Sequence, residues 1–436
     1  MLEDAVRRPA GPANITNVWN VIEHSWDIVI VGAGAAGLMA ASSAARSARS
    51  PSRILLLDGR PKIGAKILMS GGTRCNVTNR VVLPSDFSGG PRHIIQHVLE
   101  AFPGEHAAQF FRELGVALVE EEGGKYFPST HSGRTILDAL VNAVTRLGVI
   151  LQAGIRVTGV TASTRGFVLQ TSDGPRRAQA MILTTGGRSY PTTGSDGAGY
   201  AIAQSLGHTI IPPSPALTPF TTQDPDWPTL SGVSLPARLT LLARGNTVAV
   251  YEGPLLFTHT GFSGPAALNM SRHWIREGWH GPVVCRANFL PEVHEATLRQ
   301  QCVAVATTTQ TIKRWMAQRL PERFVAVLLK KAGISTQRRM NQLTRAERER
   351  LIEGVLRYPL EINGVVGYQK AEVTAGGVDL REVHPATMES RRVPGLYFAG
   401  EILDVDGRIG GFNFQWAWSS GVLAGRAAAV AVRRAD

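Results

Sequence analysis

Short apolar runs and longer amphipathic stretches divide the chain into elements. Residues 27–31 form a continuous, largely β-branched run that leads into glycines, which is typical of a strand buried on both faces of a parallel sheet. An alanine-rich stretch over 35–49 predicts a helix, and the apolar run at 54–58 predicts the next strand. Together they predict one strand–helix–strand unit.

Predicted helices and strands continue to follow one another up to about residue 210. Helical periodicity covers 92–102, 106–114 and 133–147. Between 149 and 183, short β-rich runs with turn signals at Gly166 and Asp173-Gly174 predict a small antiparallel layer, which leads into a strand at 180–184. Near the other end of the chain, 395–400 predicts a buried strand and 411–433 a long helix of small residues.

The middle of the chain has a different character. Residues 211–289 are rich in Pro, Thr and short β-like segments, which favours a small barrel or sandwich, and 296–355 has helical patterns with Arg- and Gln-rich faces. Strand patterns return at 364–378. We therefore expect a nucleotide-binding domain in two parts, 24–210 and 364–436, interrupted by an inserted domain at 211–363 with a helical subdomain at about 290–355.

Composition narrows the class of protein. The chain has 436 residues, of which 44% are hydrophobic and 18% charged, so it can bury a large core. Its longest run of apolar residues or glycine, 28–41, is shorter than the roughly 20 residues that cross a bilayer, and 1–26 lacks the apolar block of a secretory signal. Three cysteines without a CxxC pair disfavour zinc ribbons and disulfide scaffolds. We expect a cytoplasmic protein without a metal site.

The net charge of +12, with a pI near 10.1, permits two interpretations. One is a polyanionic partner such as RNA or an acidic membrane surface; the other is a solvated basic surface. No lysine block concentrates the charge, and glutamates dilute the densest group of arginines at 338–350. The sequence therefore favours the solvated surface and a small-molecule substrate over nucleic acid. It leaves the oligomeric state open.

A dinucleotide motif follows the first predicted strand. Gly32-Ala-Gly34-Ala-Ala-Gly37 is a GxGxxG sequence between a strand and a helix, and Asp58 ends the second strand. The first glycine permits the tight turn, the second the approach of a pyrophosphate, and the third close helix–strand packing. Asp58 can accept hydrogen bonds from ribose hydroxyls. This context predicts a bound dinucleotide but does not distinguish NAD from FAD.

Further glycine-rich loops favour FAD. They lie at 62–79, after the strand at 180–184, and at 400–413 before the last helix. Several such loops at strand ends suit a long cofactor across the sheet edge. A glycine pair that opens a helix offers N–H donors to the electron-rich edge of a flavin ring.

In five segments the chain resembles the BaiN/YhiN-like flavoproteins, a branch of the FAD oxidoreductases with two dinucleotide-binding folds. The segments are 27–37, 64–79, 186–208, 256–265 and 371–421. The resemblance implies a Rossmann-like FAD domain split by an inserted β-barrel that carries a small helical subdomain. Two positions depart from the family: Thr73 stands where a glycine is usual, close to the expected path of the flavin, and Ile409 where a threonine is usual.

The resemblance and the motifs together name the residues expected to bind FAD non-covalently. The glycine motif would hold the pyrophosphate, Asp58 the ribose and Glu401 the ribityl chain, and the loops at 71–76 and 410–413 would flank the isoalloxazine. The expected cofactor-binding residues are Gly32, Gly34, Ala36, Gly37, Asp58, Lys66, Gly71, Gly72, Arg74, Cys75, Asn76, Val157, Gly186, Gly187, Gly400, Glu401, Gly410, Gly411, Phe412 and Asn413.

Three residues are candidates for catalysis. Cys75 lies in the flavin-loop pattern and could act as a thiol, although a small buried packing residue is the preferred interpretation. His259 precedes a predicted helix start at Ser263-Gly-Pro265 and could donate a proton or serve structure. Tyr190 could protonate a reduced double bond or pack within its loop. Arg74 could neutralise reduced flavin or an anionic substrate group, or form a salt bridge within its loop.

These observations predict an FAD-dependent oxidoreductase. The flavin would take hydride from NADH or NADPH and pass it to an organic acceptor, which the resemblance suggests is a conjugated carbon–carbon double bond. Two alternatives remain: an FAD-dependent tRNA-modifying enzyme, and a flavin-binding redox sensor without turnover. The substrate and the choice between NADH and NADPH are left open.

Overall fold

The computed structural model describes residues 25–48 and 52–432. The expectations for residues 1–24, Arg49 and 433–436 therefore lie outside the described residues.

The first large sheet is mixed and has seven strands among the described residues. Five run parallel: β7 (Ile150–Ala153), β2 (Ile54–Asp58), β1 (Ser25–Val31), β10 (Arg176–Leu183) and β20 (Leu396–Phe398). The antiparallel pair β8 (Val157–Ser163) and β9 (Gly166–Thr171) joins the first half of β10. The expected parallel sheet with a small antiparallel layer is confirmed. β10 begins four residues before the predicted strand because its first half pairs with β9.

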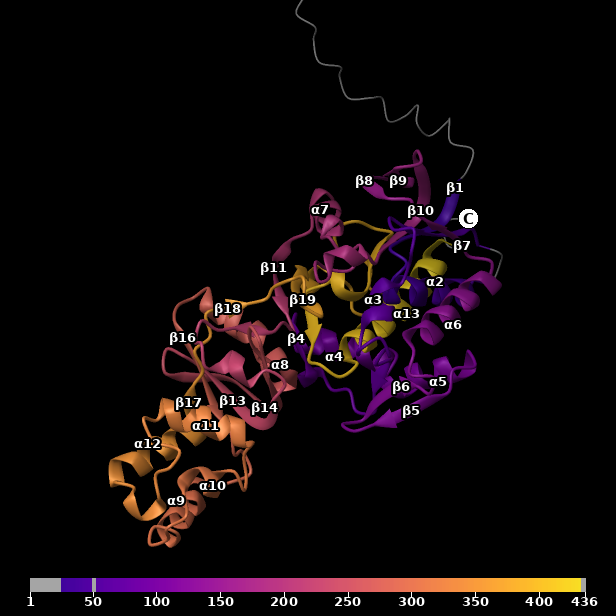
Figure 1. The fold of residues 1–436 in the computed structure, drawn as a ribbon. Helices are drawn as coiled ribbons and strands as arrows, with labels where there is room; N and C mark the ends of the chain where they lie inside the picture. Colours follow the sequence, from indigo (N-terminus) through magenta and orange to yellow (C-terminus); the bar gives the residue numbers. More distant parts are fainter. Residues whose placement is uncertain (1–24, 49–51, 433–436) are drawn as a thin grey trace, which may run out of the picture.

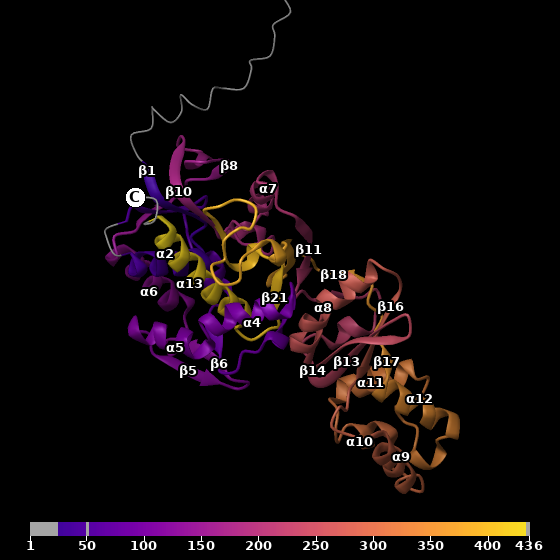
Figure 2. The same cartoon turned by 180° about the vertical axis from the view of Figure 1, so that it is seen from behind.

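Two helices from opposite ends of the chain pack against each other beside this sheet (Figures 1 and 2). They are α2 (Ala35–Ser47) and α13 (Phe412–Val432). A Cβ at Gly425 of α13 would lie 2.2 Å from the carbonyl oxygen of Ala40. The small residues of both helices therefore allow their backbones to approach closely.

The other helices of this part surround the same core. They are α3 (Ala65–Met69), α4 (Arg92–Ala101), α5 (Gly104–Glu113), α6 (Gly133–Arg146) and α7 (Ala198–Ser205). α3 lies inside the stretch 62–79 that the sequence predicts as a loop, because five residues suffice for one helical turn between glycines. Two small sheets complete this part: β3 (Thr78–Asn79) with β6 (Lys125–Pro128) and β5 (Leu118–Glu121), and β4 (Phe87–Gly89) with β21 (Val405–Gly407).

Two antiparallel strands mark where the chain leaves this part and returns to it. β11 (Ile210–Ala216) pairs with β19 (Val373–Val378). Between them lies a second seven-stranded sheet, antiparallel throughout, in the order β17 (Tyr358–Pro359), β16 (Val283–Asn288), β13 (Ser234–Ala243), β14 (Asn246–Thr258), β15 (Gly261–Ser263), β12 (Phe220–Thr221) and β18 (Gly364–Val365). Its pairings form an open path. The expected barrel is therefore not confirmed.

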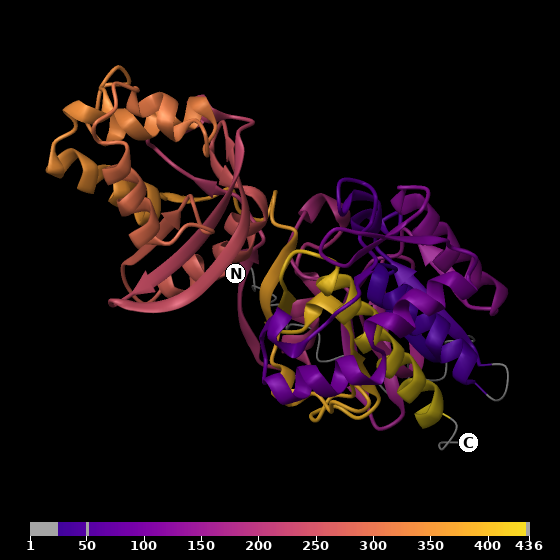
Figure 3. The same cartoon turned by 90° about the horizontal axis from the view of Figure 1, so that it is seen from below.

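Helices pack against this second sheet. α8 (Gly264–Gly278) packs on the strands, and α9 (Glu295–Ala304), α10 (Ile312–Met316), α11 (Glu322–Lys331) and α12 (Arg345–Leu356) form a helical group beyond them. Figures 1 and 3 show the three parts in a row, with the α/β part at one end and the helical group at the other. One large buried cluster draws on residues 28–210 and 378–432, and another on 220–360.

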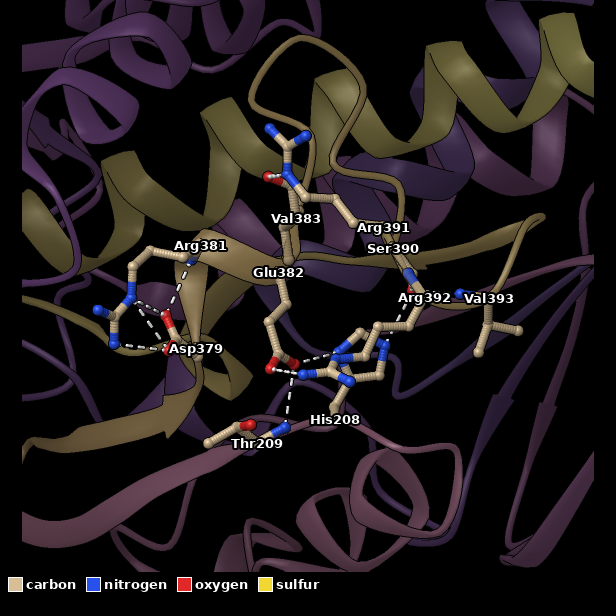
Figure 4. A network of polar contacts seen from close by, with 10 residues as sticks. All are labelled: His208, Thr209, Asp379, Arg381, Glu382, Val383, Ser390, Arg391, Arg392 and Val393. Carbon is tan, nitrogen blue, oxygen red and sulfur yellow. Dashed lines mark hydrogen bonds and ion pairs between the residues drawn. The ribbon is translucent and has the colours of Figure 1, made fainter.

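A buried polar network ties the start of β11 to the segment before β20 (Figure 4). His208 is fully buried, with Nδ1 3.0 Å from Glu382 Oε2 and Nε2 2.9 Å from Ser390 Oγ. Glu382 also accepts hydrogen bonds from Thr209 N at 3.0 Å and from Arg392 at 2.5 Å. These contacts satisfy the polar groups where the chain crosses toward the second sheet.

No helix within residues 25–48 and 52–432 has the length and apolar character that spanning a membrane requires.

Candidate cofactor-binding site

A cavity of about 600 Å³ lies where the parallel strands end. Its walls include residues directly after β1, β2, β10 and β20, and ligands of open α/β sheets bind at this carboxyl edge. Most residues expected to bind FAD line it: Gly32, Gly34, Ala36, Asp58, Lys66, Gly71, Gly72, Arg74, Asn76, Val157, Gly186, Gly400, Glu401, Gly410, Gly411 and Asn413. Folding thus brings segments that are far apart in the sequence to the walls of one cavity.

The three glycines of the motif differ in what surrounds the position of a Cβ atom. Gly32 has φ +108°, and a Cβ there would lie 2.6 Å from the carbonyl oxygen of Thr184. A Cβ at Gly37 would lie 1.8 Å from the oxygen of Gly32. By contrast, Gly34 has φ −84° and nothing within 4 Å of its Cβ position. The fold therefore does not require glycine at 34, whereas a ligand close to the backbone does.

The N-terminus of α2 lies at the same place. Gly34 is the residue that precedes the helix, no side chain caps it, and the first turn contains no acidic residue. Its free N–H groups and partial positive charge suit a pyrophosphate.

Asp58 connects the second strand to this loop. Its Oδ2 accepts a hydrogen bond from Ala33 N at 2.8 Å, and its Oδ1 accepts one from Arg60 N at 2.8 Å. Burial raises the pKa of Asp58 above its ordinary value, while the two backbone hydrogen bonds act in the opposite direction. Each oxygen retains a further lone pair, so the carboxylate can stabilise the glycine loop and still accept from ribose hydroxyls.

Glu401 is held by a polar network of the cavity wall. Lys66 Nζ lies 2.6 Å from Oε2, and Oε1 accepts hydrogen bonds from Ser189 Oγ at 2.8 Å and Thr374 N at 2.9 Å. Lys66 Nζ also donates to Ser189 Oγ at 2.7 Å. The network fixes four segments around one carboxylate. Lys66 and Glu401, both expected to bind the cofactor, face the cavity as an ion pair.

Asn76 and Gly411 meet at one wall of the cavity. Asn76 is 8% exposed, and its Oδ1 has no hydrogen-bond partner among residues 25–48 and 52–432. A Cβ at Gly411 would lie 2.8 Å from that oxygen and 2.8 Å from Thr78 O. A buried acceptor without a partner suits a ligand that carries an N–H group, and the flavin ring has one.

Four of the residues expected to bind the cofactor do not line the cavity: Gly37, Cys75, Gly187 and Phe412. Gly187 packs behind the wall, where a Cβ would lie 2.4 Å from Thr374 Oγ1. Phe412 is fully buried, and its ring centroid lies 6.1 Å from that of Phe87. These residues support the site from behind. Thr73 adopts φ +71°, a conformation that favours the family's glycine, and its side chain does not line the cavity.

The three catalytic candidates lie in different surroundings. Cys75 is fully buried, and burial raises the pKa of its thiol to about 12, so it stays protonated at neutral pH. His259 is exposed in the turn between β14 and β15 and does not line the cavity. Tyr190 does line it, with the pKa of its hydroxyl raised by burial and then by the charge of Glu372. The cavity thus contains only the tyrosine of the three.

Arg74 lies at the cavity wall with two contacts. Its guanidinium lies 4.2 Å from the centroid of the Phe127 ring, and its Nη1 lies 2.7 Å from Glu121 Oε1. Arg74 therefore does form a salt bridge, but with Glu121 of β5 and not within its own loop as the sequence alternative had it, and this contact holds the arginine beside the cavity.

Sequence reasoning missed several lining residues. Arg156 precedes β8, Lys125 and Phe127 lie on β6, and Leu217 and Glu372 lie where the chain leaves and re-enters the α/β part. Of these residues, only Glu372 could have been noticed in the sequence, because it is an acidic residue directly before an apolar strand. The others reach the cavity only through tertiary packing.

Four features of the cavity suit the binding of FAD. They are the open space at Gly34, the uncapped helix N-terminus beside it, the carboxylate of Asp58 and the unpartnered oxygen of Asn76.

Comparison with known proteins agrees with this fit. The family model described as HI0933-like protein Rossmann domain matches residues 26–427. The chain is 37% identical to a ribosomal RNA dihydrouridine synthase of Escherichia coli over 399 residues, which cover 91% of this chain and 96% of the relative. It is 35% identical to a 3-dehydro-bile acid delta(4,6)-reductase of Clostridium scindens over 406 residues, 92% of this chain and 98% of the relative.

A solved structure shares the fold. The Mycobacterium smegmatis Sdh1 complex in the apo form superposes with a TM-score of 0.51 at 16% identity, over 94% of this chain and 69% of that chain. The glycine motif, the cavity and a family match over nearly the whole chain lead to one conclusion: the chain belongs to the HI0933-like Rossmann family of FAD-dependent oxidoreductases.

Proposed function

We propose that the protein is an FAD-dependent reductase of a ring carbon–carbon double bond conjugated to a carbonyl group. The observation that carries this proposal is what the two similar enzymes have in common. Their names specify different molecules, dihydrouridine in ribosomal RNA and a 3-dehydro-bile acid. Forming dihydrouridine from uridine and reducing a 3-keto acid at delta(4,6) both saturate a ring double bond conjugated to a carbonyl group. A shared reaction on different substrates is expected where the protein positions one cofactor and varies the remaining pocket.

FAD would be bound by the residues that line the cavity. The backbone at Gly34 and the N-terminus of α2 would hold the pyrophosphate, Asp58 the ribose, and the Lys66–Glu401 pair the ribityl region. Asn76 and the glycines 410–411 would lie beside the ring. When bound, FAD supplies the hydride chemistry, and the chain's own residues orient the cofactor and the substrate and exclude water.

NADH or NADPH is proposed as the electron donor. The sequence has one clear GxGxxG motif, so the donor would visit the flavin transiently rather than occupy a second dinucleotide site. A cytoplasmic location, expected from the cysteine content, stays a prediction.

The division of the chain is also part of the proposal. We propose that 24–210 and 364–436 form the FAD domain and 211–363 an inserted domain. Support comes from the two separate buried clusters and from the β11–β19 pair between them. Leu217 and Glu372, next to that pair, line the cavity, so the inserted domain would help to enclose the substrate.

Anaerobic stopped-flow spectroscopy tests the reaction. The purified yellow protein is mixed with NADH or NADPH, and the reduced protein is then mixed with 3-keto-Δ4,6 steroids, smaller cyclic enones, quinones or oxygen. We expect bleaching by one nicotinamide nucleotide and reoxidation by a cyclic enone faster than by oxygen. Reoxidation by quinones or oxygen alone would contradict the proposal.

A uracil base of ribosomal RNA is the second candidate substrate. The relative named for that reaction favours it, together with the exposed Arg314, Arg339 and Arg345 of the helical group, which form no ion pair among the described residues. Adding an unmodified ribosomal RNA transcript to the same reoxidation assay distinguishes the two. The redox sensor without turnover is disfavoured because both relatives are named as enzymes.

A further inference from the structure

Glu372 presents a carboxylate without a protein partner to the cavity. Its backbone is anchored, since its N–H donates to Leu217 O at 3.2 Å and its carbonyl accepts from Ser189 Oγ at 3.4 Å. Its side-chain oxygens, however, have no hydrogen bond or ion pair within residues 25–48 and 52–432. Glu401, in the same wall, is fully engaged by Lys66, Ser189 and Thr374. Of these two glutamates, Glu372 is therefore the one available to a ligand.

Glu372 lies toward the end of the cavity where the flavin ring is expected. Its neighbours Leu217 and Val373 belong to a small buried apolar cluster, and Ile409 packs against that cluster. Ile409 directly precedes Gly410 and Gly411, and its N–H donates to Asn269 Oδ1 at 2.8 Å. This chain of contacts connects Glu372 to the loop proposed to lie beside the ring.

The surroundings of Glu372 shift its proton affinity upward. Glu372 has an exposed side chain that lines the cavity, and the protein atoms packed around its carboxyl group raise the pKa of that group above its ordinary value through desolvation. Tyr190 interacts electrostatically with Glu372, and the Ser189 hydroxyl that donates to the Glu372 carbonyl oxygen also contacts Lys66 and Glu401. Burial raises the pKa of Tyr190, and the charge of Glu372, when it is ionised, raises it further.

We propose that Glu372 is a catalytic acid that protonates the substrate, an inference that rests on the proposed function. Reduction of a conjugated double bond adds a hydride to the carbon remote from the carbonyl and a proton to the carbon next to it. Reduced flavin, when bound, would supply the hydride and its two electrons. The proton comes from the Glu372 carboxyl group, whose O–H bond breaks as the new C–H bond forms. The carboxylate then takes a proton from water.

The other candidates fit this role less well. Cys75 does not line the cavity and holds its proton too tightly, and His259 lies outside it. Tyr190 lines the cavity, but burial and the nearby carboxylate make its hydroxyl a weaker acid than an ordinary phenol. A carboxylic acid whose pKa is raised above its ordinary value is a better general acid near neutral pH than an ordinary carboxyl group.

The test separates proton delivery from electron transfer. Holoenzyme variants Glu372→Gln and Glu372→Asp are compared with wild type and with Glu113→Gln, a change on the exposed side of α5. Each is reduced with dithionite and mixed anaerobically with a cyclic enone, a uridine-containing ribosomal RNA transcript, or ferricyanide, which accepts electrons without a proton. FAD content is measured for every variant.

Glu372→Gln should slow reoxidation by the accepted substrate about 10²- to 10⁴-fold while leaving the ferricyanide rate within about twofold of wild type. The wild-type substrate rate should fall as pH rises through the carboxyl pKa, and that limb should vanish in Glu372→Gln and persist in Glu372→Asp. A wild-type substrate rate in Glu372→Gln overturns the inference. An equal loss with ferricyanide, or weakened FAD binding at an unchanged rate, also overturns it, because Glu372 would then serve the cofactor.

An infrared measurement distinguishes failure of the inference from failure of the proposed function. If neither enones nor RNA reoxidise the wild-type protein, the proposed function is wrong. The difference spectrum between wild type and Glu372→Gln then still decides the state of the residue. A protonated carboxyl band that persists above about pH 5 and is absent from the variant supports a cavity acid, and its absence overturns the inference.

Discussion

At the scale of single residues, the glycine motif contains two kinds of glycine. Gly37 is required by the protein, since a Cβ there would lie 1.8 Å from a backbone oxygen, whereas Gly34 faces open space with an ordinary φ. We expect Gly34→Ala to fold with an unchanged melting temperature of the apoprotein but to lose at least about tenfold in FAD affinity. Gly37→Ala should destabilise the apoprotein by about 1–3 kcal/mol.

Calorimetric melting of both apoproteins and fluorescence titration with FAD measure these effects. Equal loss of stability in the two variants would show that the space at Gly34 is filled by the protein itself.

Asp58 serves both the fold and the cofactor. Asp58→Ala removes the acceptor for Ala33 N as well as the proposed acceptor for the ribose. We expect FAD affinity to fall by about 1.5–3 kcal/mol, which is roughly ten- to a hundredfold. Asp58→Asn retains one oxygen acceptor and should lose less. FAD titration of the two variants checks this order, and unchanged affinity in Asp58→Ala would refute the ribose assignment.

At the scale of elements, α8 and β21 are joined across the two parts of the molecule by a buried ion pair. Arg272 Nε lies 2.7 Å from Asp406 Oδ2, with the side chains 13% and 2% exposed. Burial raises the pKa of Asp406 to about 6, and Arg272 opposes that rise. The folded state therefore binds this proton more tightly than the unfolded chain, so the contribution of Asp406 to stability falls as pH rises from about 4 through about 6.

Arg272→Leu would leave the Asp406 carboxylate without its partner. We expect a loss of about 3–5 kcal/mol at neutral pH and a smaller loss near pH 5, where Asp406 can accept a proton. The double variant Arg272→Leu with Asp406→Leu should recover part of the loss. Denaturant unfolding at the two pH values measures this, and a loss that does not depend on pH would contradict the role of Asp406.

The network of Figure 4 has the opposite pH dependence. Hydrogen bonds from Arg392 and Thr209 lower the pKa of Glu382 to about 2 in spite of burial. Its stabilisation is therefore complete above the unfolded pKa of about 4.5 and is lost as pH falls toward about 2. Glu382→Gln should be destabilised by up to about 3 kcal/mol at neutral pH, and the difference from wild type should shrink in acid.

Melting curves from about pH 7 to about pH 3 measure this difference. Glu100→Gln, on the exposed face of α4, serves as the control and should follow wild type at every pH. A constant difference between Glu382→Gln and wild type would show that packing, rather than charge, makes the variant less stable.

At the scale of the whole molecule, the net charge of +12 is distributed over a long, three-part shape. If it is only surface charge, RNA should bind weakly, with a Kd of roughly 10⁻⁴–10⁻⁶ M and steep salt dependence. Filter binding with transfer RNA and ribosomal RNA fragments measures this. A tighter complex with one ribosomal fragment, weakened by Arg314→Glu with Arg339→Glu, would instead establish the second candidate substrate.

The α/β elements could be predicted from the sequence because their signals are local. The dinucleotide motif lies within 32 residues: the apolar run of β1, the glycines after it, and Asp58 at the end of β2. Each of these residues has a role that follows from its own backbone or side chain, without a contact to a distant segment. Most residues expected to bind FAD also line the cavity. The predicted strand at 364–378 was less accurate, since only its ends are strands, and the predicted barrel closure was not confirmed.

Tertiary structure alone decided which other residues line the cavity beside the glycine motif. Glu372 and Leu217 are 155 positions apart, yet the β11–β19 pair brings them to the same wall. The engagement of Glu401 by Lys66, and the freedom of Glu372 beside it, depend on which side chains the fold brings within hydrogen-bond distance. Burial likewise distinguishes Cys75 from Tyr190, because desolvation is a property of the packed environment and not of the residue type.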